Sequence, residues 1–238
     1  MWILLAVVSA LCLGAYDIFK KISVDGNNVP VVLFFNTLFS ALLMSPVLII
    51  GVTGSEAILG GGVTGHIHIL IKSFIVLSSW LLGYFGLKHL PLTIAGPINA
   101  ARPVIVLVGA LLIFGEHLNW LQWIGILLGF WSLFFISRLG SKEGFSFKHS
   151  KWLWFSIGAT FMGAVSALYD KWLLKLYEPL EVQAWYSFYQ LIIMGVTLWL
   201  VIRFAPGNKT RFHWSWAIPF ISVFLTVADP VSYTHLTL

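Results

Sequence analysis

Long hydrophobic runs alternate along the chain with short polar or Gly- and Pro-rich stretches. A helix that crosses a bilayer needs about 20 apolar residues, and eight runs reach or approach that length. They cover residues 2–22, 31–51, 69–87, 91–114, 120–137, 152–174, 182–204 and 214–228. The runs are continuously apolar and do not alternate, which favours helices over the strands of a membrane barrel. The pattern therefore predicts an all-α, polytopic bundle of membrane helices.

Composition supports a chain that is solvated partly by lipid. Hydrophobic residues make up 59% of it and charged residues 10%, whereas soluble domains carry about a quarter charged residues. The net charge of +5 is spread between the apolar runs, without the basic stripe typical of nucleic-acid binding. The single cysteine, Cys12, excludes an intramolecular disulfide. We expect the lipid bilayer as a partner, no nucleic acid, and a multi-pass protein of the cell (inner or cytoplasmic) membrane.

The order of the runs indicates an internal repeat. The polar stretch 138–151 divides them into five and three. A shift of 150 positions aligns the two groups without a gap and pairs Trp2 with Trp152, Lys21 with Lys171, Val32 with Val182 and Met44 with Met194. A tandem repeat with an odd number of spans places its two copies in opposite orientations. We therefore expect a first repeat at 1–138, a polar linker at 139–151 and a partial second repeat at 152–229.

The end of the chain departs from the repeat. Two complete units would hold ten spans, and about eight are present. The last residues, VSYTHLTL, are polar where a helix core is expected. This string resembles the translation of a common sequencing adapter, so our hypothesis is that residues 230–238 are a non-native tail.

The segment 89–138 resembles the fourth and fifth helices of an EamA-type repeat, found in the drug/metabolite transporter superfamily. That pattern combines a mid-helix proline, an apolar run, Gly-Glu at the helix end, a Gln and Gly-x-x-x-Gly. The matching residues here are Pro103, Gly115, Glu116, Gln122, Gly125 and Gly129. The stretch SALYDKWLL at 166–174 also looks like the first helix of a second repeat. The resemblance implies a ten-helix carrier with two inverted five-helix repeats around a central cavity, of which this chain lacks the last two helices.

Arg102 is the first candidate for substrate binding. An arginine near the middle of a span costs about 2.5–3.5 kcal/mol on insertion scales and usually faces a bundle interior. Helical spacing places Asn99 on the same face, and a guanidinium can clamp a carboxylate or a phosphate. The alternative is a structural ion pair with a neighbouring helix. Pro97 and Pro103 bracket this site and predict a kink or hinge, although prolines also serve as packing devices in membrane helices.

Other polar and aromatic residues extend the candidate site. Asp17 and Asp170 are coupling-ion candidates; the alternative is that they form interfacial pairs with Lys20, Lys21 and Lys171. Further cavity candidates are Asn36, Trp80, Tyr84, Trp131, Trp185, Tyr186 and Gln190, although helix packing or lipid contact also explains the aromatic ones. Gly125 and Gly129 indicate helix packing within the repeat, with a homodimer as the other possibility. Glu116 has an expected local role, as an anion near the start of the next helix.

No catalytic or cofactor pattern stands out. His66-x-His68 is too sparse for a metal site, and neither an ATP-binding motif nor a nucleophile–histidine–acid spacing is present. We expect no metal, no cofactor and no enzyme. The preferred function is secondary transport, with export of a small metabolite such as an amino acid or a related amphipathic compound, by alternating access. Because no ATP-binding motif is present, any energy is expected to come from an ion gradient. The alternatives are an enzyme acting on a lipid or lipid-linked substrate and a non-transporting membrane subunit.

Loop charges leave the orientation of the N-terminus open. Loops after odd-numbered spans carry most of the Lys and Arg residues, and the opposite loops hold only Lys72, Lys171 and Lys175. The positive-inside rule therefore places the N-terminus outside. The family resemblance implies the reverse.

Overall fold

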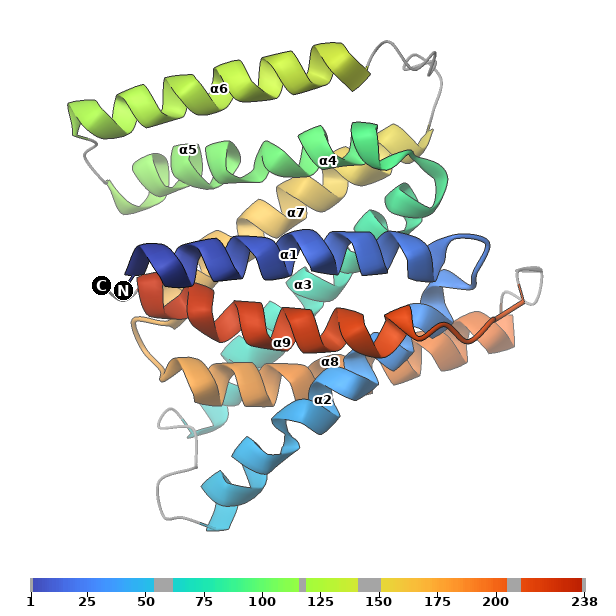
Figure 1. The fold of residues 1–238 in the computed structure, drawn as a ribbon. Helices are drawn as coiled ribbons and strands as arrows, with labels where there is room; N and C mark the ends of the chain where they lie inside the picture. Colours follow the sequence, from blue (N-terminus) through green and yellow to red (C-terminus); the bar gives the residue numbers. More distant parts are fainter. Residues whose placement is uncertain (1, 54–61, 116–118, 141–150, 205–210, 237–238) are drawn as a thin grey trace. The chain divides into compact units, whose positions relative to one another are not determined.

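The computed structural model describes residues 2–53, 62–115, 119–140, 151–204 and 211–236 (Figure 1). Within these ranges every regular element is a helix, which confirms the predicted all-α architecture. Most of the predicted linker 139–151 lies outside the described residues, and so does Glu116.

The helices follow the hydrophobic runs closely. They are α1 (Trp2–Val24), α2 (Val29–Thr53), α3 (Gly62–His89), α4 (Leu92–Ala100), α5 (Arg102–Phe114), α6 (Trp120–Gly140), α7 (Lys151–Leu173), α8 (Pro179–Phe204) and α9 (Ala217–Leu236). Within the described residues, five segments are long and apolar enough to cross a membrane: Val29–Ile49, Gly62–His89, Leu92–Phe114, Lys151–Leu173 and Pro179–Phe204. The chain is therefore a multi-pass membrane protein.

Two elements differ from the predicted spans. The fourth span is two helices, because α4 ends at Ala100 and α5 begins at Arg102. Pro97 and Pro103 flank this break, and proline removes a backbone donor and crowds the preceding turn. The last helix begins three residues later than expected, at Ala217, and continues to Leu236 instead of ending near residue 228. The side chains of the suspected tail, 230–238, lie outside the description.

The turn between α1 and α2 illustrates how the sequence ends a helix. Gly26 has a φ of 60°, a left-handed conformation that glycine adopts without a steric penalty. Asn28 then starts α2, because its side-chain oxygen accepts a hydrogen bond from the backbone N–H of Val31 at 3.5 Å, as N-cap residues do. The stretch Asp-Gly-Asn-Asn thus ends one helix and caps the next.

The helices form two compact units, which do not follow the order of the chain. Unit 1 contains Met1–Leu77 and Tyr169–Leu238, and unit 2 contains Ser78–Leu168. Helices α3 and α7 therefore contribute their two ends to different units.

Within unit 1, α1 packs along α9 and α2 packs against both α8 and α9. The ring of Phe19 on α1 stacks on Phe220 at 5.4 Å and on Phe224 at 5.5 Å, both on α9. Contacts of this kind join helices that are distant in the sequence.

Within unit 2, α3 and α7 approach closely. The Ser79 hydroxyl donates to the backbone oxygen of Ala159 at 2.8 Å. At Gly86, an added Cβ would lie 2.5 Å from the hydroxyl oxygen of Ser156, so only glycine allows this approach. The His89 ring stacks on Trp152 at 3.6 Å.

Candidate functional site

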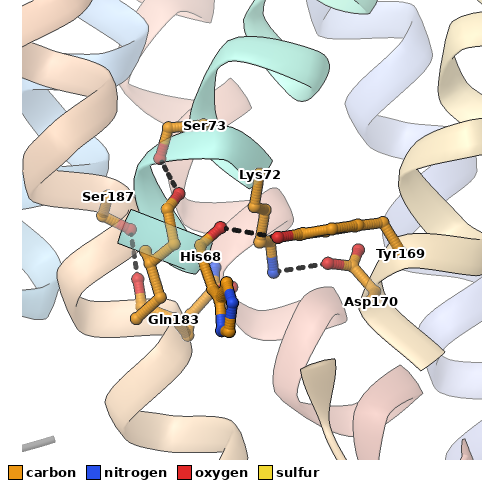
Figure 2. Close-up of polar contacts among 8 residues, drawn as sticks. His68, Lys72, Ser73, Tyr169, Asp170, Gln183 and Ser187 are labelled. Atoms are coloured by element: carbon orange, nitrogen blue, oxygen red, sulfur yellow. Dashed lines mark hydrogen bonds and ion pairs between the residues drawn. The ribbon is translucent and has the colours of Figure 1, made fainter. Parts of the chain in front are cut away.

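A buried ion pair joins α3 to α7 in unit 1. The ammonium nitrogen of Lys72 lies 2.9 Å from Oδ1 of Asp170, and the two side chains are 1% and 12% exposed. The Lys72 ammonium also lies 4.6 Å from the ring centroid of Tyr186 on α8, within cation–π range. Figure 2 shows the pair between the two helices. Both charges are withdrawn from water and paired, as buried charges in membrane proteins usually are.

Hydrogen bonds around the pair fix the neighbouring side chains. The Tyr169 hydroxyl donates to the backbone oxygen of His68 at 3.2 Å (Figure 2). The Nδ1 atom of His68 lies 3.1 Å from the hydroxyl of Tyr177, which follows α7. The His68 ring also meets the edge of Trp172 at 4.9 Å. The start of α3 is therefore held to the end of α7 by aromatic and polar contacts as well as by charge.

His66, two residues before His68, makes similar contacts with residues of α8. Its Nδ1 atom lies 3.0 Å from the Tyr189 hydroxyl, and its ring meets the Trp185 ring at 4.6 Å. The two histidines thus contact different tyrosines and do not converge on a common ligand.

A neutral hydrogen-bonded pair lies at the other end of the same unit. The Ser222 hydroxyl on α9 is 2.8 Å from Oδ1 and 2.9 Å from the backbone oxygen of Asn36 on α2. Both residues are fully buried. This pair joins two helices that are distant in sequence, as the ion pair does.

The neutral and charged sites occupy equivalent positions in the predicted repeat. Ser222 stands 150 residues after Lys72, Tyr186 stands 150 after Asn36, and Asp170 stands 150 after Lys20. All six residues are buried. With this shift, Lys72, Asp170 and Tyr186 of the charged site correspond in turn to Ser222, Lys20 and Asn36.

Unit 2 contains a separate cationic site at the break between α4 and α5. The Thr160 hydroxyl of α7 lies 3.3 Å from the backbone oxygen of Ile98 and 3.3 Å from Oδ1 of Asn99. The guanidinium of Arg102 lies over Gly163, where an added Cβ would be 2.7 Å from Cζ and Nε. Arg102, the first residue of α5, therefore packs against Gly163 of α7.

Arg102 is exposed, and no carboxylate among the described residues lies within 4.0 Å of it. A guanidinium in this position has its donors available to an anion. The carboxylate partner considered in the sequence analysis is not seen in the described part of the chain.

The sequence model of the EamA-like transporter family matches residues 1–138, which is more than half of the chain. The chain belongs to this family. The resemblance drawn from Pro103, Gly115 and Gly125 is thereby confirmed. No curated protein matches the chain.

The family consists of membrane transporters of small molecules, and the predicted site residues of this EamA-like protein fall in both of its units. Asn36, Tyr186, Gln190 and Asp170 lie buried in unit 1. Asp17 and Trp185 are half-buried residues of the same unit. The candidates in unit 2 are Trp80, Tyr84, Asn99, Arg102, Trp131, Pro97, Pro103, Gly125 and Gly129. Tyr84 is fully buried, Trp80 is half-buried, and Trp131 is 66% exposed.

Lys72 is the residue that sequence reasoning missed. The hydropathy pattern places it among the loop charges, whereas it lies inside α3 and is buried. The expected partner of Asp170 was the adjacent Lys171, but the ion pair is with Lys72 of another helix. The signal was present in the sequence, since Lys72 interrupts the apolar run 69–87 just as Arg102 interrupts its own.

Asp17 and the two glycines of α6 have few contacts. Asp17 is half-buried, and among the described residues it makes no ion pair with Lys20 or Lys21. No described atom of another segment lies within 4 Å of where a Cβ of Gly125 or Gly129 would stand. The roles expected for these three residues stay predictions.

Proposed function

We propose that this EamA-like protein is a secondary transporter that exports a small polar metabolite, such as an amino acid or a related amphipathic compound, across the cell membrane. The observation that carries the proposal is the buried Lys72–Asp170 pair between two membrane-spanning helices. Removing one partner from a buried ion pair typically costs about 3–5 kcal/mol. A pair of this kind therefore holds α3 and α7 together until something else satisfies one of the charges.

A charged group of the substrate, or a coupling ion, would meet that condition. A substrate carboxylate can replace Asp170 beside Lys72, and a proton or a cation can replace Lys72 beside Asp170. Either exchange weakens the contact between α3 and α7, because it replaces the attraction between Lys72 and Asp170. The size of the conformational shift is set by how much more tightly the ligand binds one conformation than the other. Asp170 is in this proposal the coupling residue.

Two inverted repeats that alternate access give this exchange a direction. The proposal is supported by two contacts that the turns between helices make with distant segments. The turn after α1 contacts His213 before α9, through Asn27, and the turn after α7 contacts His68 near the start of α3. If every predicted span crosses the bilayer, each contact joins two segments on the same side, and the two contacts lie on opposite sides.

Transport assays in proteoliposomes test the proposal. Purified protein is reconstituted with amino acids, small carboxylic acids and their amides, with and without a proton or sodium gradient. Saturable flux that depends on the protein is expected, together with loss of most of it in Lys72→Gln and Asp170→Asn. Lys175→Gln is the matched control, since Lys175 is exposed. Wild-type flux in folded Lys72→Gln and Asp170→Asn would refute the role of the pair.

The same assay separates the alternatives. An enzyme acting on a lipid would change the chemical composition of the vesicles without moving solute. A non-transporting subunit would do neither.

A further inference from the structure

In the described part of unit 1, a serine of α2 and a glutamine of α8 each bury a polar side-chain atom without a hydrogen-bond partner. Among the described residues, Oγ of Ser40 makes no hydrogen bond and Nε2 of Gln190 donates none. These residues are 6% and 1% exposed. Buried polar groups are paired in the great majority of cases, and one that is left unpaired destabilises the fold. Their presence in the middle of a packed interface therefore needs a reason.

Ser40 differs from the other serines in the helices of unit 1. The hydroxyls of Ser23, Ser73 and Ser187 each donate to the backbone oxygen four residues earlier, at 2.8 to 2.9 Å. That local bond is the usual way for a serine inside a helix to satisfy its hydroxyl. Ser40 does not make it, so its hydroxyl is available to another group.

The positions of Ser40 and Gln190 relate them to each other. They stand 150 residues apart, near the middle of α2 and of α8. These two helices pack together, and a ring atom of Phe34 lies 3.7 Å from where a Cβ of Gly195 would stand. In the proposed inverted repeat the equivalent contact joins Ser45 to Ala184. With both contacts formed, Ser40 and Gln190 would lie midway between them, and we take this position as the crossing point of the helices.

The two described sites flank this crossing. Asn36, which bonds to Ser222, lies one turn before Ser40, and Tyr186, which lies under Lys72, is one turn before Gln190. A solute held at the crossing would thus have the neutral pair on one side and the ion pair on the other. The middle position itself offers an uncharged amide N–H donor and a hydroxyl.

We propose that the crossing of α2 and α8 is a binding position for an oxygen atom of the transported solute, a carbonyl or carboxylate oxygen. Gln190 donates to it through Nε2, and Ser40 contacts it through Oγ, once the two helices separate. The inference rests on the proposed transport function and on the inverted repeat. It assigns recognition of the solute's oxygen to neutral groups and leaves recognition of its charge to Lys72 and Asp170.

The test uses two nearly isosteric variants, Gln190→Met and Ser40→Ala, in the full chain. Melting temperatures in detergent and KM values in proteoliposomes are measured for solutes that the wild type transports. We expect melting temperatures of the solute-free variants equal to or above that of the wild type, because an unpaired buried group has been removed. We expect KM to rise about five- to tenfold for each lost hydrogen bond.

A control variant and a control solute sharpen the result. Ser187→Ala removes a hydroxyl that is already bonded within α8, so its KM should equal that of the wild type. Alanine is compared with ethylamine, which lacks the carboxylate, and the loss in Gln190→Met should affect only alanine. If alanine is not a substrate, the same comparison uses any transported carboxylate and the matching compound without its carbonyl oxygen.

The outcomes separate this inference from the function on which it rests. Absence of flux in the wild type would overturn the transport proposal. Flux in the wild type with unchanged KM in both variants would overturn only the binding position and would assign the unpaired atoms to water. Lower melting temperatures of the solute-free variants would also overturn it, because they would reveal internal partners for Ser40 and Gln190.

Discussion

The turn after α1 and the turn after α7 each contact a distant segment, which lies in the other predicted repeat, but the chemistry of the two contacts differs. Asn27 donates through Nδ2 to the backbone oxygen of His213 at 2.7 Å and accepts from its N–H at 3.0 Å. The neutral Asn36–Ser222 pair and the Phe19 stack continue this contact along α9. At the turn after α7, the contact with α3 combines the Tyr177–His68 hydrogen bond with the Lys72–Asp170 ion pair.

Positions that the predicted repeat makes equivalent are therefore held by interactions of different strength. A neutral hydrogen bond contributes about 0.5–1.5 kcal/mol net, whereas breaking one partner of a buried ion pair costs about 3–5 kcal/mol. In the proposed carrier, we call the side held by the Lys72–Asp170 pair the charged end and the side held by Asn27 and the Asn36–Ser222 pair the neutral end. We expect the charged end to be harder to open unless a ligand compensates the charge. We expect the neutral end to open without such compensation.

The largest expected effect comes from breaking the charged end. Lys72→Gln or Asp170→Asn alone should lower the free energy of unfolding by about 3–5 kcal/mol, because each leaves a buried charge without its partner. The double variant should recover part of this loss. A double-mutant cycle from unfolding in detergent measures the coupling, and a double variant less stable than both single variants would contradict the pairing.

The neutral end should respond less and independently. Asn27→Ala removes two hydrogen bonds to the segment before α9, with an expected cost of about 2 kcal/mol. The opening is measured as maleimide labelling at Ala217→Cys near the start of α9, after replacement of Cys12, the only native cysteine. A second reporter is placed at Ala184 of α8, and both Ala217 and Ala184 are buried.

The second reporter makes this test reciprocal. Asn27→Ala should raise labelling at Ala217→Cys and leave labelling at Ala184→Cys of α8 unchanged. Lys72→Gln should have the opposite pattern. Equal responses of the two reporters to both variants would show that the ends do not open separately.

The same elements show how much of the fold and of the candidate site could be predicted from the sequence. Hydropathy predicts the helices because burial in lipid acts on each segment alone, and Pro97 and Pro103 mark the break between α4 and α5. The alignment of Val32 with Val182 also places the buried faces of α2 and α8. The partner of Asp170 could not be found in this way, since the contact between α3 and α7 depends on tertiary packing that no local spacing records.

Arg102 of unit 2 is a third case, because its guanidinium packs against Gly163 and, in the described part of the chain, against no carboxylate. Gly163→Ala would place a Cβ 2.7 Å from Arg102 Cζ, so the guanidinium must move. Overpacking typically costs about 1–3 kcal/mol, and replacing a helical glycine regains about 1 kcal/mol, which leaves a net loss of about 1 kcal/mol.

Flux measurements decide whether that displacement affects function. If Arg102 binds an anionic group of the solute, Gly163→Ala should raise KM. Gly158→Ala on the same helix is the matched control, because its Cβ would meet Leu82 at an ordinary 3.4 Å. A KM that rises equally in both variants would point to a general effect of α7 and not to Arg102.

The smallest effect is expected at the edge of the charged end, where a neutral bond supplements the ion pair. Tyr177→Phe removes the hydroxyl that lies 3.1 Å from Nδ1 of His68 and keeps the ring. We expect a loss of about 0.5–1 kcal/mol in the free energy of unfolding, together with a small rise in labelling at Ala184→Cys. Tyr189→Phe, which removes the hydroxyl 3.0 Å from His66, should cost a similar amount without a change in the contact between α7 and α3. If Tyr177→Phe destabilised the protein as much as Lys72→Gln does, the hydrogen bonds and not the charges would hold this end, and the contrast between the two turns would disappear.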